Sequence, residues 1–264
     1  MSHDSAAYVL DFAKVAAARG SDTRNYQTAY GTPLGHSLSV DQQEFNREAV
    51  AQPIILGYLD DFSLSADSFS CSLAVKKPDS FEIAIPAELK FCLPIARLVG
   101  EDILDMYGSE EFHKTDILLI VKKSLVESGE AGRPAFERWH DHVHDRMPYD
   151  WVYAFGNALP TKFNRHGVVK HTEQGAVTRF GAEILHGSSI NTGASVERVW
   201  GAFSVSPAIR TGLPMSLTHN PVFSASEDKL AEFRNAAEEI LLNDRTYRPV
   251  TPRHIYDAPV FEAA

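Results

Sequence analysis

The most informative segment of this 264-residue chain reads Ala182-Glu183-Ile184-Leu185-His186-Gly187-Ser188-Ser189-Ile190-Asn191-Thr192-Gly193. A short apolar run ends at His186, a small polar turn follows, and a second β-rich run begins near Val196. Two strands joined in this way place a histidine at the end of one strand and bring Arg198 back alongside it. An arginine in that position offers a planar fork for a carboxylate.

Short β-rich segments separated by turn residues surround this histidine. Their regular spacing is typical of an all-β barrel or sandwich. The expected strands are Trp151–Phe155, Leu159–Phe163, Val168–His171, Ala176–Phe180, Glu183–Leu185 and Val196–Val205.

The rest of the chain adds helices and further strands. Hydrophobic periodicity and capping residues predict helices over 5–19, from Ser39 to before Pro53, from Pro94 to about Tyr107, over 134–141, and over Glu227–Asn243 with Ser224 and Glu227 as a capping box. Further strands are expected at Ile54–Phe62, Phe69–Lys76, Phe81–Phe91 and Asp116–Val121, and an extended tail after Arg245.

The segment around His186 resembles the distal half of the iron site in phytanoyl-CoA-hydroxylase-like members of the Fe(II)- and 2-oxoglutarate-dependent dioxygenase superfamily. That family's pattern is a His-Gly-Ser turn, an Asn-Thr or Asn-Ser pair and then an arginine, as at His186, Asn191 and Arg198. The resemblance covers about residues 175–205 and includes the preceding strand at 175–180. It implies Fe2+ and 2-oxoglutarate as cofactors, His186 as a metal ligand, and Arg198 as the clamp on the remote carboxylate of the cosubstrate.

The same resemblance implies a mainly β fold with flanking helices and a double-stranded β-helix (jelly-roll) core. No linker is evident, so we expect a single domain over 1–264. Its parts are N-terminal helices and strands in about 1–123, the main jelly-roll strands in about 140–210, and the C-terminal helix at 227–243.

The remaining metal ligands are open between two sets of residues, because the family's His-x-Asp pattern does not occur in the chain. His140, His142 and His144 alternate, so two neighbours among them would share a strand face and could join His186 in a three-histidine site. A polar helix face explains them equally well. The rival is His171-Thr172-Glu173, a His-x-Glu pair. A turn at 174–175 would leave it about 26 Å from His186 along the strands.

Two other functions compete with the oxygenase. Pro78-Asp79 followed by Glu88-Leu89-Lys90 resembles the PD-(D/E)xK nuclease motif, in which Glu88 and Lys90 would share a strand face at a magnesium site completed by Asp67 or Asp79. The third reading is a non-catalytic jelly-roll binding protein. A basic island is also present, and it could meet nucleic acid through its phosphates or a phosphorylated or carboxylated small substrate, although a solvated loop is the default explanation. Its residues are Lys162, Arg165, His166, Lys170, His171 and Arg179.

Composition limits the partners. With 25 basic and 35 acidic residues the formal net charge is −10, which disfavours a protein that coats nucleic acid. No apolar run is long enough to span a bilayer. The start lacks the features of a signal peptide, and Cys71 and Cys92 are expected to be free thiols. We therefore expect a cytoplasmic protein with a small-molecule substrate, for which a homodimer is allowed.

Overall fold

The computed structural model describes ten stretches of the chain, and the account below is confined to them. They are residues 7–19, 52–60, 62–64, 70–77, 80–113, 115–130, 139–141, 151–182, 184–207 and 221–256. The helix expected from Ser39 lies outside them. In this part of the chain no helix is both long enough and apolar enough to cross a membrane.

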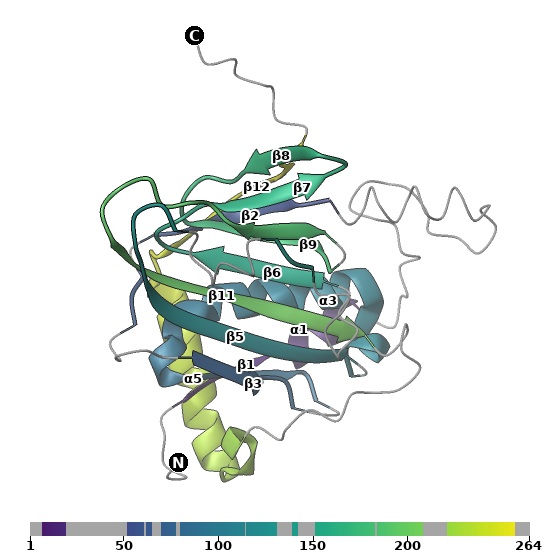
Figure 1. Cartoon of the computed structure of the whole chain (residues 1–264). Coiled ribbons are helices and arrows are strands. Elements are labelled where there is room, and N and C mark those ends of the chain that lie inside the picture. The colour runs from purple at the N-terminus through teal and green to yellow at the C-terminus, as the bar shows by residue number, and fades with distance from the viewer. Residues whose placement is uncertain are drawn as a thin grey trace, which may run out of the picture.

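A seven-stranded antiparallel sheet forms the centre of the structure (Figure 1). Its strands come from the whole length of the described chain. Segments before residue 123 and after residue 245 add strands to the sheet that was expected between residues 140 and 210. In spatial order they are β12 (Tyr247–His254), β2 (Ile54–Leu59), β9 (Ala176–Gly181), β6 (Trp151–Gly156), β11 (Val196–Pro207), β5 (Thr115–Val126) and β3 (Ser70–Ala74).

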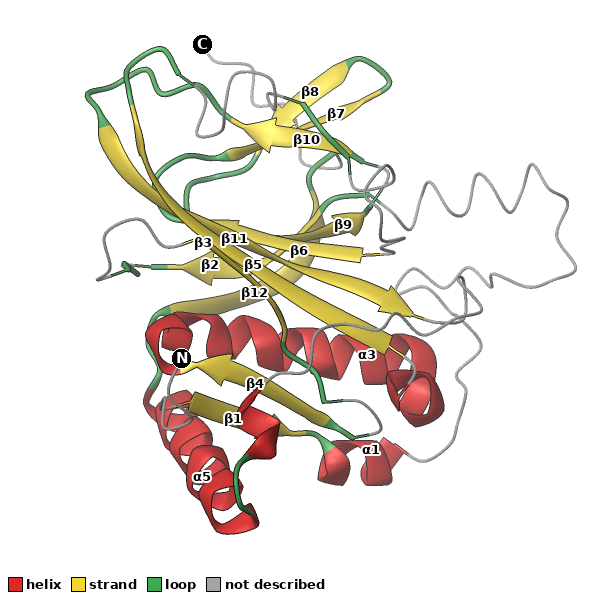
Figure 2. Ribbon diagram, turned by 60° about the horizontal axis from the view of Figure 1, so that its bottom comes forward, coloured by secondary structure: helices red, strands yellow, loops and turns green. Residues whose placement is uncertain are grey.

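A small sheet of three antiparallel strands lies over one face of the large sheet (Figure 2). Its order is β10 (Leu185–Ser188), β7 (Thr161–Arg165) and β8 (Val168–His171). The chain passes from β6 in the large sheet to β7 and β8 in the small one, returns to β9, crosses to β10 and returns to β11. This alternation between two facing sheets is the double-stranded β-helix, or jelly roll, predicted from the sequence.

An apolar core fills the space between the two sheets. Strand alternation turns Phe163 of β7 and Phe180 of β9 toward each other, with their ring centroids 5.0 Å apart and their planes near perpendicular. Val152 of β6 and Ala202 of β11 pack beside them. This core holds the sheets together at the level where His186 enters the space between them.

Helices cover the other face of the large sheet (Figure 2). The long helix α3 (Leu93–His113) packs its buried side on the sheet, while α5 (Glu227–Asn243) packs beside the strand pair of β1 (Ala7–Asp11) and β4 (Glu82–Pro86). A short helix α1 (Ala13–Arg19), and the 3-10 helices η1 (Ala87–Cys92) and η3 (Pro221–Ser224), complete this layer. Cys92 is buried and is not in a disulfide, and the side chain of Cys71 lies outside the described part.

Three expectations from the sequence were wrong at the level of elements. The helix expected over 5–19 begins only at Ala13, because residues 7–11 pair with β4 as a strand. The strand expected over 81–91 turns into η1 after Pro86. Residues 139–141, expected in a helix, are not helical, and His140 forms an antiparallel bridge with His186 of β10.

The C-terminal helix has the predicted bounds, but Ser226 rather than Ser224 caps it, accepting a hydrogen bond from the Lys229 amide. In the tail after Arg245, the described residues 247–254 are extended, as predicted, and form the edge strand β12. An edge position suits this segment because its prolines cannot donate to a neighbouring strand.

Gly201 on β11 is the tightest glycine position of the large sheet among those described. A Cβ atom there would lie 2.5 Å from Cζ of Phe155 and 2.7 Å from the backbone oxygen of Ile120, which cannot move away without disturbing β5. We expect Gly201→Ala to lower the free energy of unfolding by about 1–3 kcal/mol in urea denaturation. Gly193→Ala is the control, since its Cβ would meet only Asn191 Oδ1 at 3.6 Å. Equal stability of the two variants would contradict the prediction.

Candidate functional site

His186 enters the space between the sheets from β10, the strand at one side of the small sheet. It pairs with Phe163 on β7, and the two residues point to the same side of the sheet. The imidazole is only 3% exposed. Its ring centroid lies 4.5 Å from that of Phe180 and 6.1 Å from that of Phe163. Two aromatic rings thus enclose the histidine and keep bulk water from it.

A hydrogen bond fixes how the His186 ring is turned. Its Nδ1 lies 2.9 Å from the carbonyl oxygen of Ile184. Because a carbonyl oxygen can only accept, Nδ1 carries a proton, and in the neutral ring Nε2 is the nitrogen that has the lone pair. Histidines that ligate metals are commonly held in this way, with one ring nitrogen donating to a backbone carbonyl.

His140 faces His186 across an isolated antiparallel bridge. The amide of each residue donates to the carbonyl of the other, at 3.0 Å and 2.9 Å. The two ring centroids are 4.0 Å apart, with an angle of 52° between the planes. Nitrogens that ligate one ion lie roughly 3–3.5 Å apart, given bonds of about 2.1 Å. The two imidazoles are in direct contact, so sharing an ion would require the rings to turn these nitrogens toward a common point. The structure therefore brings together two of the four histidines proposed as ligands.

The other two, His142 and His144, lie outside the described residues. Within the described part of the chain, no group of three or more His, Cys, Asp or Glu side chains is arranged to hold a metal ion. Among the described residues, the proposed donors that lie together are His140 and His186.

Arg198 reaches the same space from β11, as the sequence predicted. It is 3% exposed, and its Nη1 donates to Ser188 Oγ at 2.5 Å. Ser188 follows His186 by two positions on β10, so both side chains point between the sheets. From the sequence, Ser188 was predicted only as part of a turn. Its hydroxyl instead holds the guanidinium about 6.6 Å along the strand from the histidine, at the usual rise of 3.3 Å per residue.

A small cavity connects these side chains. Its volume is about 20 Å3, enough for about one water molecule. Thr161, His186, Ser188, Arg198 and Trp200 are among the residues that line it. A five-carbon diacid is several times larger, so binding one here requires the lining side chains to move apart.

The rival pair His171 and Glu173 belongs to other surroundings. β8 pairs with β7 rather than with β9, so His171 lies opposite Lys162 and not opposite Thr178. Its Nδ1 is hydrogen-bonded to Ser189 Oγ at 2.8 Å. Glu173 accepts hydrogen bonds from Arg253, at 2.7 Å, and from Tyr58. Burial raises the pKa of Glu173, but these two donors outweigh it and hold the pKa below its usual 4.5. In the structure this pair does not join His186 in one ligand set.

The strand face expected for the nuclease does not exist. Glu88 and Lys90 lie in the 3-10 helix η1, both exposed, and not on one side of a strand. Asp67 and Asp79 lie outside the described residues. The basic island is also divided, because Arg179 lies on the helix-covered face of the large sheet, in an ion pair with Asp102 at 2.7 Å.

No protein-family model and no curated protein matches the chain. Several solved structures resemble it remotely. A 2OG-Fe(II) oxygenase family oxidoreductase from Burkholderia pseudomallei is 12% identical, with 62% of this chain and 76% of that one covered and a TM-score of 0.32. A full-length protein from Neurospora crassa in complex with alpha-KG and thymine is 10% identical, with 83% and 82% covered and a TM-score of 0.35. A Pseudomonas putida prolyl-4-hydroxylase is 12% identical, with 77% and 94% covered and a TM-score of 0.34. Likenesses of this degree leave the function to be argued from the chain's own residues.

Proposed function

We propose that this chain is an Fe(II)- and 2-oxoglutarate-dependent oxygenase that hydroxylates a small molecule. The observation that carries the proposal is the meeting of His186 and His140, with ring centroids 4.0 Å apart, beside an arginine anchored on the same strand through Ser188. Two imidazoles and a buried guanidinium at one end of a jelly roll suit a metal ion together with an organic acid.

In this proposal His186 binds iron through Nε2, because its Nδ1 proton is held by the Ile184 carbonyl. His140 is the second ligand, and His142 or His144 supplies the third. Bound iron would supply the chemistry, in which oxidative decarboxylation of 2-oxoglutarate to succinate is coupled to hydroxylation of a substrate C–H bond. Phe163 and Phe180 exclude water from the ligands and hold the His186 ring in place.

Arg198 would bind the remote carboxylate of 2-oxoglutarate. Carbon–carbon bonds of about 1.5 Å separate the two carboxyl carbons of a five-carbon diacid by about 5 Å, and His186 and Arg198 line one cavity. The guanidinium fork matches a carboxylate in two parallel hydrogen bonds. Ser188 positions that fork and has no chemical role of its own.

The test measures iron retention and succinate release from 2-oxoglutarate by the purified full chain. We expect the wild type to retain iron and to release succinate. Arg198→Met should raise the 2-oxoglutarate concentration for half-maximal turnover at least about 30-fold, equivalent to ~2 kcal/mol for a lost buried charge partner. Its effect on iron retention should be small. Arg97→Met, on the exposed side of α3, is the control and should leave both measurements unchanged.

Each alternative gives a different result. A protein that retains no iron, zinc or manganese under any loading condition is the non-catalytic binding protein. Plasmid cleavage that depends on magnesium and is lost in Glu88→Ala, without succinate release, would support the nuclease. An Arg198→Met variant with wild-type dependence on 2-oxoglutarate would remove Arg198 from the proposal.

A further inference from the structure

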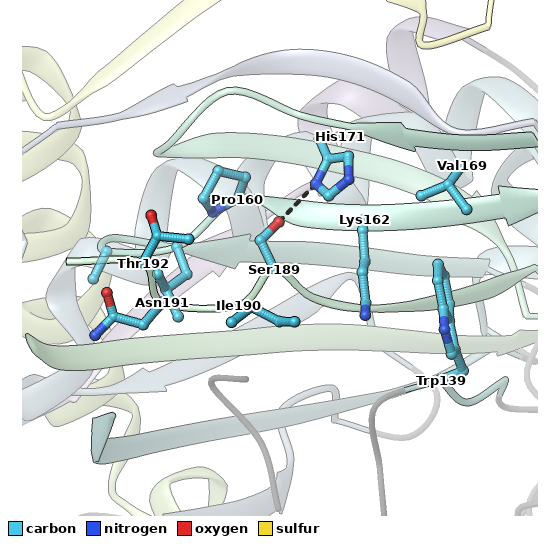
Figure 3. Close-up of a pocket in the computed structure, with 11 residues that line it drawn as sticks. Trp139, Pro160, Lys162, Val169, His171, Ser189, Ile190, Asn191 and Thr192 are labelled. Carbon is cyan, nitrogen blue, oxygen red and sulfur yellow. Dashed lines mark hydrogen bonds between the residues drawn. The ribbon is translucent and has the colours of Figure 1, made fainter. Parts of the chain in front are cut away.

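A large pocket is lined by residues of the small sheet and of the segments next to it (Figure 3). Strand alternation determines which residues reach it. Phe163 and His186 point between the sheets, so their neighbours Lys162 and Gly187 face outward. Lys162 pairs with His171 on β8 and with Gly187 on β10, which places the three positions in one row. The pocket measures about 660 Å3, within the usual range for small-molecule sites.

A stacked pair of side chains forms one end of the pocket. The bridge between His140 and His186 places Trp139 next to Gly187 at the end of the row. Because glycine has no side chain, Lys162 can extend across it, and its Nζ lies 4.3 Å from the centre of the Trp139 ring. The contact is a cation–π interaction that holds the ammonium in a defined position. Lys162 is only 9% exposed, so its side chain is packed at the wall of the pocket and is not a mobile surface group.

His171 and Ser189 form a second polar group beside Lys162. His171 Nδ1 and Ser189 Oγ are 2.8 Å apart, as the dashed line in Figure 3 marks. This bond orients the imidazole, and its other nitrogen lies on the opposite side of the ring. Thr192 adds a hydroxyl at the exposed rim. Hydrogen-bonding groups of the pocket are thus held in place before any ligand arrives.

The charge of the lining favours an anion. None of the described residues that line the pocket is acidic, whereas Lys162 is cationic and His171 offers a ring nitrogen. The whole β7–β8 hairpin, residues 161–171, contains two lysines, one arginine and two histidines and no acidic residue, in a chain whose net charge is −10. The remaining lining is largely apolar, provided by Trp139, Leu159, Pro160, Val169 and Ile190.

We propose that this pocket binds a small organic anion, a carboxylate or phosphate ester carried on a flat apolar group. Lys162 and His171 recognise the anionic end, and the apolar group lies against Trp139 and Ile190. The proposal does not depend on the oxygenase activity, since Lys162 and His186 point to opposite faces of the small sheet. It gives a use to the lysine and the histidine that the sequence placed in a basic island.

The experiment titrates the full chain with benzoate, phenyl phosphate and the neutral benzyl alcohol, using calorimetry and ligand-observed NMR. We expect one or both anions to bind with a Kd of about 1 mM or lower. The Kd of benzyl alcohol should be higher by about tenfold or more. Lys162→Met, which keeps the apolar stem, should raise the Kd about tenfold or more. His171→Gln is a second variant that tests the anionic end without altering the stacked pair.

Lys170→Met is the matched control, because Lys170 is in the same hairpin but pairs with Phe163, on the opposite face. It loses the same charge and should keep the wild-type Kd. Tighter binding of benzoate would identify a carboxylate as the natural group, and tighter binding of phenyl phosphate a phosphate ester. The proposal is overturned if neither anion binds the wild type, if benzyl alcohol binds as tightly, or if folded Lys162→Met and His171→Gln proteins bind like Lys170→Met.

Discussion

Iron-loaded protein carrying His186→Ala should release succinate at least about 1,000-fold more slowly than the wild type, and should lose its iron on gel filtration. Substituting a residue that hydrogen-bonds to a metal ligand commonly lowers metal affinity or activity by roughly 10- to 100-fold. Removing the ligand itself should lower both by a larger factor. The fixed ring of His186, whose Nδ1 is hydrogen-bonded to the Ile184 carbonyl, is the basis of this expectation. Metal content by mass spectrometry and succinate release at saturating 2-oxoglutarate are the two measurements.

Two further variants separate ligation from packing. His186→Leu keeps an apolar side chain against Phe163 and Phe180, so a loss of iron in this variant cannot be attributed to an emptied core. His166→Asn changes an exposed histidine at the β7–β8 turn, where φ is 50° and asparagine is tolerated. It should retain iron and activity. If His186→Leu keeps both, His186 is not a ligand, and the proposed function fails with it.

The strands of the jelly roll were predictable because local signals mark them. β8 has the bounds expected from its sequence, and β6, β9 and β11 differ only at their ends. Where a segment's structure depends on a distant partner, local signals failed. Residues 7–11 have helix-like periodicity, yet pairing with β4, more than 70 residues later, makes them a strand. Tertiary pairing overrides a weak local preference in such a segment.

The contacts of the site also differ in whether nearby sequence could predict them. His186 and Arg198 are separated by one short connection, so their meeting follows from two consecutive strands. His140 meets His186 from 46 positions earlier in the chain, through a bridge that no local pattern indicates. The outer pocket depends on the same bridge, because it places Trp139 beside Gly187 and within reach of Lys162.

A buried ion pair joins α3 to the large sheet and should be the most sensitive polar contact of the described fold. Arg179 Nη1 donates to Asp102 Oδ2 at 2.7 Å, and the Tyr153 hydroxyl donates to the same oxygen at 3.2 Å. Burial raises the pKa of Asp102 above 3.8, although Arg179 and Tyr153 act in the opposite direction. The charged carboxylate is therefore tolerated largely because the guanidinium is next to it.

Arg179→Met should lower the free energy of unfolding by about 3 kcal/mol at pH 7, because it leaves a largely buried carboxylate without its cation. Removing one partner of a buried ion pair usually costs about 3–5 kcal/mol. We expect the lower end of that range because 20% of the Asp102 side chain is exposed. Urea denaturation of the single variants and of Arg179→Met with Asp102→Leu measures the coupling. The double variant should recover most of the loss, since it removes both charges together.

The pH dependence gives an independent check. A carboxyl whose folded pKa lies above its unfolded value binds its proton more tightly in the folded state, so its contribution to stability falls as pH rises through that window. Losing Arg179 raises the folded pKa of Asp102 further, and the deficit of Arg179→Met should therefore shrink as the pH is lowered from 7 toward 5. A deficit that is the same at both pH values, or that persists in the double variant, would mean that Arg179 stabilises the fold by packing against Trp151 and not by neutralising Asp102.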